Sequence, residues 1–276
     1  MKRLLIAGFG DIARRLVPLL PFGIELRRVS RSAGYDLDRP DTLSDLAGWP
    51  DAVLHCAPPP DAGEGDPRTA QLLGILERGI LPARLVYIST SGVYGDCAGE
   101  LVDEERAPNP RSPRARRRLA AETMLGNWCA ARDVALVVLR APGIYAADRL
   151  PLARLRAATP VLRDEDDVYT NHIHADDLAA IALRALEANA PPGVYNASDD
   201  SRLKMAQWLD LVAEHYALPR PPRVARRDAE GRIPPALLSF MGESRRLDNR
   251  KMKELLGVRL HYPTVYDGLR AAKEPA

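Results

Sequence analysis

The sequence predicts an α/β fold in which helices cover both faces of a doubly wound parallel sheet, and three observations support this. Short, continuously apolar segments such as "RLLIAG" (3–8) and "RLVYIST" (84–90) have the character of buried parallel strands. Segments with helical spacing alternate with them. The helices are long enough for right-handed strand–helix–strand crossovers, which join parallel strands.

The alternation can be followed element by element from the first residue to Gly143. Prolines and glycines separate the segments, and Asp41 is a suitable N-cap for one of the helices. The expected strands are 3–8, 23–30, 51–58, 84–90 and 134–143. The expected helices are 11–20, 41–49, 67–80 and 117–133.

Composition narrows the class of protein. The chain has 276 residues, 46% of them hydrophobic, which is enough for one sizeable core plus a small satellite. A net charge of +2 and 5% aromatic residues give no case for nucleic acid or a membrane surface as partner. No apolar run approaches the roughly 20 residues of a membrane span, and the N-terminus looks like a strand rather than a signal peptide. The three cysteines form no Cys-x-x-Cys pair, so we expect reduced thiols, no metal site and a cytoplasmic protein.

A glycine turn lies between the first strand and the first helix. "GFGDIA" (8–13) fits G-x-G-x-x-G/A, in which Gly8 allows the tight turn and Gly10 lets a pyrophosphate approach the backbone. The N–H groups that follow would face the phosphates. The motif predicts a Rossmann-type dinucleotide-binding domain whose cofactor contacts include Gly8, Phe9, Gly10, Asp11 and Ile12.

The domain organisation follows from the point where the alternation breaks. A helical segment at 149–159 lies outside the pattern, and the chain after about Asp199 is mostly helical, with a proline-rich connector at 218–223. We expect a dinucleotide-binding domain and a small, mostly helical C-terminal substrate subdomain. The first comprises residues 1–142 plus about 168–198, and the second about 143–167 plus 199–276.

The end of the second strand indicates which dinucleotide binds. An acidic residue about 20 residues after the glycine turn would hold the ribose of NAD, but "RRVSRSAG" (27–34) has no carboxylate there. Ser30 and Arg31 offer donors and positive charge, which favours the 2′-phosphate of NADP, with NAD as the alternative. Further candidate cofactor contacts are Asp36 and Leu37 near the adenine edge, and Cys56, Ala57 and Pro58 in a channel after the third strand.

Several motifs in order resemble a known family. The segments "GFGDIARRL", "YISTSGVYGD", "LRAPGIYA", "IHADDLAAI" and "RRLDNRKMKELLG" look like an extended or atypical short-chain dehydrogenase/reductase of the NAD-dependent epimerase/dehydratase superfamily. The resemblance implies that Thr90 hydrogen-bonds the reacting oxygen of the substrate. It also implies cofactor contacts at Gly143 and at the start of the helix at 117–133.

The family's Tyr-x-x-x-Lys motif is missing. Anchoring on Glu122 places Arg118 at the lysine position, where it would contact the cofactor, and Arg114 at the tyrosine position. Only five of the 39 basic residues are lysines, and none lies between Lys2 and Lys204. A guanidinium stays protonated at neutral pH, so Arg114 is a poor proton donor.

Two functions therefore stay open at this stage. One is an NADP-dependent oxidoreductase, epimerase or dehydratase with a non-standard active site. Its substrate would be a small hydroxylated metabolite, and a phosphorylated or nucleotide-linked metabolite is one option. A homodimer is compatible with either function. The other is a non-catalytic NADP-binding sensor or scaffold. In "NHIHADDL" (171–178), we expect Asp176 to cap the helix that follows, rather than the histidines to bind a metal.

Overall fold

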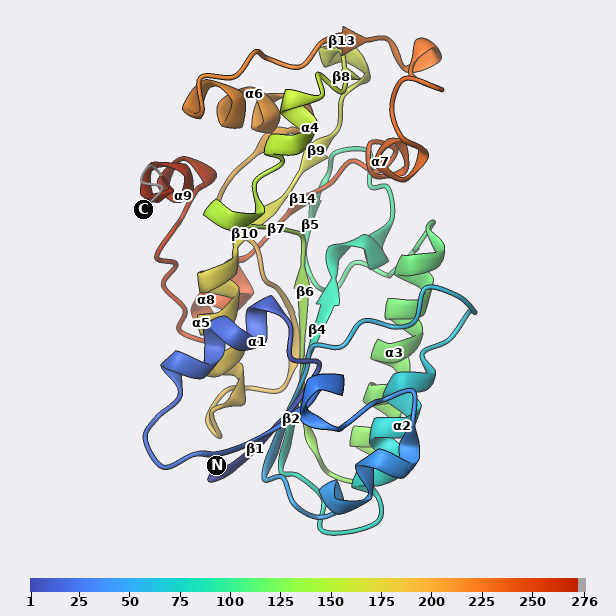
Figure 1. The fold of residues 1–276 in the computed structure, drawn as a ribbon, viewed down its shortest axis with the longest axis vertical. Helices are drawn as coiled ribbons and strands as arrows, with labels where there is room; N and C mark the ends of the chain where they lie inside the picture. Colours follow the sequence, from blue (N-terminus) through green and yellow to red (C-terminus); the bar gives the residue numbers. More distant parts are fainter. Residues whose placement is uncertain (273–276) are drawn as a thin grey trace.

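The computed structural model describes residues 1–272, and a six-stranded parallel sheet forms its centre (Figure 1). The strands lie in the order β11-β6-β4-β3-β1-β2, and every neighbouring pair is parallel. Their bounds are β1 Arg3–Ala7, β2 Glu25–Val29, β3 Ala52–His55, β4 Arg84–Thr90, β6 Ala135–Ala141 and β11 Gly193–Asn196. The chain leaves β1 toward β2 on one side and continues through β3 on the other. A crevice therefore opens at the carboxyl ends of β1 and β3.

Helices cover both faces of this sheet, as the alternating pattern predicts. Figure 1 shows α1 (Asp11–Leu16) and α5 (Ala175–Leu186) on one side, and α2 (Pro67–Leu76) and α3 (Pro113–Ala130) on the other. Successive residues of a strand point to opposite faces. In β1, Leu4 and Ile6 join the apolar cluster under α1 and α5, whereas Leu5 and Ala7 join the one under α2 and α3. The predicted fold class is confirmed.

Two predicted helices are shorter or tighter than expected. The helix expected at 11–20 ends at Leu16 and continues as a 3-10 turn, Val17–Leu19. Pro18 lacks an N–H and its ring crowds the preceding turn, which ends the α-helix. The segment expected at 41–49 is a 3-10 helix, Pro40–Leu46, and begins after Arg39 rather than at an Asp41 cap.

A third apolar cluster lies beyond the carboxyl ends of the strands, in the upper part of Figure 1. Its buried members all lie within residues 145–162 and 206–269, and include Trp208. The elements that carry it are α4 Leu152–Arg156, β8 Val161–Leu162, α6 Met205–His215, β13 Arg223–Val224, α7 Pro235–Phe240 and α9 Val265–Ala271. This grouping is compatible with the proposed substrate subdomain, whose exact limits stay a prediction.

Short strand pairs connect the two regions. They are β5 Leu101–Val102 with β14 Arg246–Leu247, β7 Gly143–Tyr145 with β10 His172–His174, and β9 Tyr169–Thr170 with β12 Leu203–Lys204. Helix α8 (Arg250–Leu255) follows β14 and packs on β11. Within residues 1–272, no helix has both the length and the apolar character of a membrane span.

The N-terminus of α5 is capped differently from the prediction. His174 is the N-cap, and its Nδ1 accepts a hydrogen bond of 3.2 Å from the Asp176 N–H. Asp176 lies in the first turn, and its carboxylate accepts a bond of 2.7 Å from Arg15 of α1. The prediction that Asp176 caps this helix was therefore wrong, because a cationic partner 161 residues away in the chain takes up its carboxylate.

Asp199 is a buried carboxyl group just after β11. Its side chain accepts a bond from the Ser201 N–H, and its backbone N–H donates to the His172 carbonyl at 2.7 Å. Its Oδ2 atom has no hydrogen-bond partner within the described residues. Burial raises the pKa of Asp199 from 3.8 to about 8.

This pKa gives a testable pH dependence. The native state retains the Asp199 proton up to a higher pH than the unfolded chain does, so this group's contribution to stability falls as pH rises from about 4 through about 8. Asp199→Asn should remove that slope, so the free energies of unfolding of variant and wild type should diverge as pH rises. Urea titrations at a series of pH values would measure this, and parallel profiles for the two proteins would contradict it.

Candidate active site

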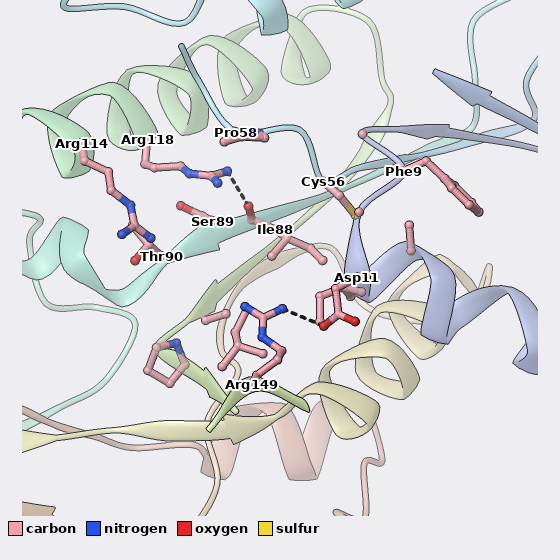
Figure 2. Close-up of a pocket in the computed structure, with 17 residues that line it drawn as sticks. Phe9, Asp11, Cys56, Pro58, Ile88, Ser89, Thr90, Arg114, Arg118 and Arg149 are labelled. Carbon is pink, nitrogen blue, oxygen red and sulfur yellow. Dashed lines mark hydrogen bonds and ion pairs between the residues drawn. The ribbon is translucent and has the colours of Figure 1, made fainter. Parts of the chain in front are cut away.

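A cavity of about 250 Å³ lies at the crevice between β1 and β3 (Figure 2). Its walls come from the glycine turn, the ends of β3, β4 and β6, the start of α3, and the segment after β7. The lining residues are Gly8, Phe9, Gly10, Asp11, Ile12, Ala13, Cys56, Pro58, Ile88, Ser89, Thr90, Arg114, Arg118, Ala141, Pro142, Ile144 and Arg149. Every segment in this list follows or faces a strand end, because parallel strands present their carboxyl ends at one edge.

The two glycines of the turn have different roles. Gly8 has a φ of +92°, and a Cβ there would lie 2.4 Å from the Ala57 backbone nitrogen. A side chain at Gly8 would therefore disrupt the contact between β1 and the loop after β3. A Cβ at Gly10 would meet no atom within 4 Å. Gly10 thus leaves open space at the cavity wall, as a bound pyrophosphate requires.

The structure brings most of the predicted cofactor contacts together. Nine of the predicted site residues line the cavity: Gly8, Phe9, Gly10, Asp11, Ile12, Cys56, Pro58, Thr90 and Arg118. Ala57 is buried directly beneath Gly8. Gly143 begins β7 outside the cavity lining, where its N–H donates to the Asn171 carbonyl at 3.1 Å.

The remaining predicted contacts lie on the other side of the glycine turn, toward β2. Ser30 follows this strand and Arg31 is exposed on the next turn, Arg31–Ala33. Asp36 forms an isolated bridge with Arg39, and Leu37 is buried in the core. These four residues are outside the cavity lining, on the side where the adenosine half of a dinucleotide would lie.

Thr90 ends β4 at the cavity wall, and its neighbour Ser89 belongs to a buried polar group. The Thr90 hydroxyl accepts a bond of 3.2 Å from the Gly92 N–H, which orients its side chain. Ser89 donates to Glu122, whose carboxylate also accepts from Arg140 at 2.7 Å. The sequence predicted Thr90 at this position. It did not identify Ser89 as a lining residue, although the hydroxyl cluster was a signal for it.

Arg118, predicted to stand at the lysine position of the family motif, has neutral partners. Its Nη1 donates to the Ile88 carbonyl at 2.9 Å and to the Tyr87 hydroxyl at 3.1 Å (Figure 2 shows the first bond). This places a cation beside a tyrosine, but Tyr87 is fully buried in β4 and does not line the cavity. Burial raises the pKa of Tyr87 to about 12 despite the adjacent charge, so this hydroxyl is poorly suited to proton transfer.

Arg114, predicted to stand at the tyrosine position of the motif, lines the cavity, and Figure 2 shows its guanidinium pointing toward Thr90. It lies 5.8 Å from the centre of the Phe240 ring in α7. Within residues 1–272, neither Arg114 nor Arg118 forms an ion pair with a carboxylate. Partial burial and the positive charge of Arg118 lower the pKa of Arg114.

Asp11 and Arg149 form an ion pair of 2.7 Å across the cavity (Figure 2). Asp11 also pairs with Arg15 at 2.9 Å. Burial alone would raise the pKa of Asp11, but the hydrogen bonds from Arg149 and Arg15 lower it. Sequence reasoning missed Arg149, because it lies after the alternation breaks and only the fold brings it to the glycine turn.

Two other groups near the cavity are poorly suited to proton transfer or nucleophilic attack. Burial raises the pKa of the Cys56 thiol to about 12, so the reactive thiolate is disfavoured. His55 is buried below the cavity, bonded to Thr69 at 2.7 Å, and burial lowers its pKa to about 4. The other polar side chains that line the cavity are those of Asp11, Ser89, Thr90, Arg114, Arg118 and Arg149. Among these, the Ser89 hydroxyl already donates to Glu122.

Comparison with known proteins decides the family. Residues 22–198 match the model of the NAD dependent epimerase/dehydratase family. The chain belongs to this family. The resemblance to this family is thus confirmed. The proteins of the family depend on NAD(P).

Two relatives illustrate how this family member compares with others. The chain is 32% identical over 209 residues to GDP-6-deoxy-D-mannose reductase of Pseudomonas aeruginosa, a match that covers 65% of this chain and 68% of the relative. It is 28% identical to a functionally unknown conserved protein from Silicibacter pomeroyi, with a TM-score of 0.80 and coverage of 99% and 98% of the two chains.

A third comparison concerns the fold alone. The structure of RMD from Pseudomonas aeruginosa, which was solved with NADPH, superimposes with a TM-score of 0.75 at 22% identity. The match covers 99% of this chain and 98% of that one. The likeness over nearly the whole of both chains agrees with the Rossmann-type architecture described above.

Proposed function

We propose that this protein is an NADP(H)-dependent oxidoreductase that acts on the carbonyl or hydroxyl group of a small metabolite. One observation carries the proposal: a single cavity joins the open wall at Gly10 to the Thr90 hydroxyl. The residues present fit a dinucleotide, because the glycine turn leaves room for a pyrophosphate and the strand ends leave room for a ring beside it. Bound NADPH would supply the hydride.

The chain's own groups would then orient the substrate. The Thr90 hydroxyl would donate a hydrogen bond to the reacting oxygen, and Arg114 would stabilise negative charge that develops there. Arg118, held by Ile88 and Tyr87, would present its guanidinium to the nicotinamide ribose. Water in the cavity would exchange the proton, because the tyrosine that does this elsewhere in the family is replaced by Arg114.

A titration of the protein with NADPH, followed by a carbonyl-substrate screen monitored by nicotinamide absorbance, tests this function. Small sugar-derived and nucleotide-linked carbonyl compounds should be included, because the relative from Pseudomonas aeruginosa is named for a nucleotide sugar. Saturable NADPH binding with turnover of one compound class is the expected result. A protein that does not bind NADPH would contradict the proposal.

The second candidate, a non-catalytic NADP(H)-binding sensor or scaffold, is favoured by one specific observation. In the alignment anchored on Glu122, arginines stand at both positions of the Tyr-x-x-x-Lys pair, Arg114 and Arg118. A sensor would bind NADPH tightly and show no turnover with any carbonyl compound in the screen. Oxidation of bound NADPH in single-turnover experiments distinguishes the two candidates.

The choice of NADP over NAD gives a further prediction. Arg31→Ala should narrow the ratio of NADPH to NADH affinity by about tenfold or more, since charge-assisted hydrogen bonds contribute roughly 1.5–3 kcal/mol. Titrations of both cofactors would measure the ratio. Arg227→Ala, which removes an equally exposed charge far from the glycine turn, is the matched control. Equal NADPH and NADH affinities in the wild type would refute the preference.

A further inference from the structure

The cavity holds more positive than negative charge, and the excess is at one end. Three arginines line it, but only one carboxylate, Asp11. Asp11 pairs with Arg149 at the glycine turn. The charges of Arg114 and Arg118 therefore remain at the Thr90 end.

Nearby groups do not neutralise these two charges. The partners of Arg118 are the Ile88 carbonyl and the Tyr87 hydroxyl, which are dipoles rather than anions. Glu122 lies one helical turn after Arg118 on α3, but its carboxylate is buried and accepts from Ser89 and Arg140. Arg114 lies over the ring of Phe240 and forms no ion pair with a carboxylate within residues 1–272. Burial and the repulsion of Arg118 lower its pKa.

The strand order places the reacting end of a dinucleotide beside these arginines. With the pyrophosphate at the glycine turn, one half of the cofactor extends toward β2 and the other toward β3, β4 and β6. If Ser30 and Arg31 bind the 2′-phosphate, as proposed, the β2 side is the adenosine side. The cavity would then hold the nicotinamide, and its walls at that end are Cys56, Ile88, Thr90 and Arg114.

The charge of the nicotinamide ring depends on its redox state, so the two arginines should affect the binding of the two redox forms differently. Reduced nicotinamide is neutral, whereas oxidised nicotinamide carries one positive charge. Two uncompensated guanidiniums in a partly desolvated cavity disfavour a third cation. An anion at the same end of the cavity would therefore favour binding of the oxidised cofactor.

Resting on the oxidoreductase function above, we propose that the substrate supplies this anion as a carboxylate next to the reacting carbon, which Arg114 binds. The substrate class is thus a short oxo acid and its hydroxy-acid product. In the reduction, the carbonyl carbon would gain a hydride from NADPH and its oxygen a proton from water, so the products would be a hydroxy acid, NADP⁺ and a hydroxide ion that the buffer neutralises. Until the carboxylate is bound, the site should prefer NADPH to NADP⁺.

If Arg114 were only a solvated surface residue, its substitution would affect cofactor binding differently from substitution of an anion-binding residue. This difference can be measured without knowing the substrate. Arg114 is on the cavity rim and keeps solvent exposure, so a role in solubility alone is the competing explanation. That role predicts equal effects of Arg114 on both redox forms of the cofactor. The proposed role predicts a redox-dependent effect that follows the charge of the residue at position 114.

The experiment measures dissociation constants of NADPH and NADP⁺, each with and without oxalate as a small dicarboxylate probe. In the wild type, NADPH should bind about tenfold tighter than NADP⁺, and oxalate should tighten NADP⁺ binding by a similar factor. Arg114→Gln should lose most of both effects, whereas Arg114→Lys should keep them because it keeps the charge. Arg116→Gln is the matched control: this residue is exposed on the same helix, is bonded to the Arg111 carbonyl and is outside the cavity lining.

The possible outcomes separate the two proposals. Equal affinities for NADPH and NADP⁺ in the wild type, an unchanged ratio in Arg114→Gln, or no effect of oxalate would overturn the inference and leave the oxidoreductase function standing. Failure of the wild type to bind either form would overturn that function as well. Loss of the ratio in Arg114→Gln but not in Arg114→Lys or Arg116→Gln would support the carboxylate-bearing substrate.

Discussion

Gly10→Val is expected to abolish NADPH binding and to leave the fold intact. The Cβ of the variant meets no protein atom within 4 Å, so the valine side chain projects into open space at the cavity wall. That space is where the pyrophosphate would approach the backbone. The dissociation constant for NADPH should rise at least about a hundredfold, which corresponds to about 2.8 kcal/mol. Fluorescence titration measures the affinity, and urea unfolding measures the stability.

Two other glycines serve as controls for this prediction. Gly65→Val also adds a side chain in open space, but outside the cavity lining, and should change neither affinity nor stability much. Gly8→Val should impair the fold itself, because of the positive φ and the contact with Ala57. NADPH affinity unchanged by Gly10→Val would mean that the dinucleotide binds elsewhere.

The second large effect concerns the buried ion pair of Glu122 and Arg140 behind the cavity. Both side chains are less than a tenth exposed, and Arg140 donates from Nε and Nη2 while its guanidinium lies 4.7 Å from the Tyr94 ring centre. Removal of one partner leaves the other charge buried and unpaired. Arg140→Met or Glu122→Leu alone should therefore cost about 3–5 kcal/mol of unfolding free energy.

The double variant tests whether the pair itself stabilises the protein. Glu122→Leu with Arg140→Met removes both charges, so it should recover much of the loss seen in either single variant. Ser89 loses its acceptor in every variant without Glu122, which sets a limit to the recovery. Unfolding free energies from urea titrations complete the cycle. Unfolding free energies of the single variants within about 1 kcal/mol of the wild-type value would show that water or other groups compensate the charge left unpaired.

The fold was predictable because its central strands, such as β3 and β4, are buried on both faces and its helices alternate with the strands. A continuous apolar run such as that of β4 predicts a buried parallel strand even when the neighbouring strands are unknown. The lengths of helices were less predictable, because a single residue such as Pro18 decides where an α-helix tightens or ends. The cap of α5 was mispredicted because His174 caps the helix and the Asp176 carboxylate instead binds Arg15, which is remote in sequence.

The candidate site was predictable where it depends on local geometry. The glycine turn and Thr90 each occupy a short segment whose neighbours in the chain define its conformation. Arg149 and Pro142 could not be assigned, since strand order alone brings them to the cavity. The sequence also could not predict that Arg114 and Arg118 lack a carboxylate partner. Glu122 of α3, the acidic residue next to them on the helix, pairs instead with Arg140 of β6.

The position of β2 at the end of the sheet affects how copies of this protein can meet. The last strand of a sheet has unpaired backbone groups that can recruit a strand from another molecule. Three of the five residues of β2, Glu25, Arg27 and Arg28, are charged, and such charges oppose edge-to-edge pairing. Pairing of two copies through their β2 strands is therefore disfavoured, and a sheet continued between copies would have to use the other edge strand, β11. The same charges oppose aggregation through the β2 edge.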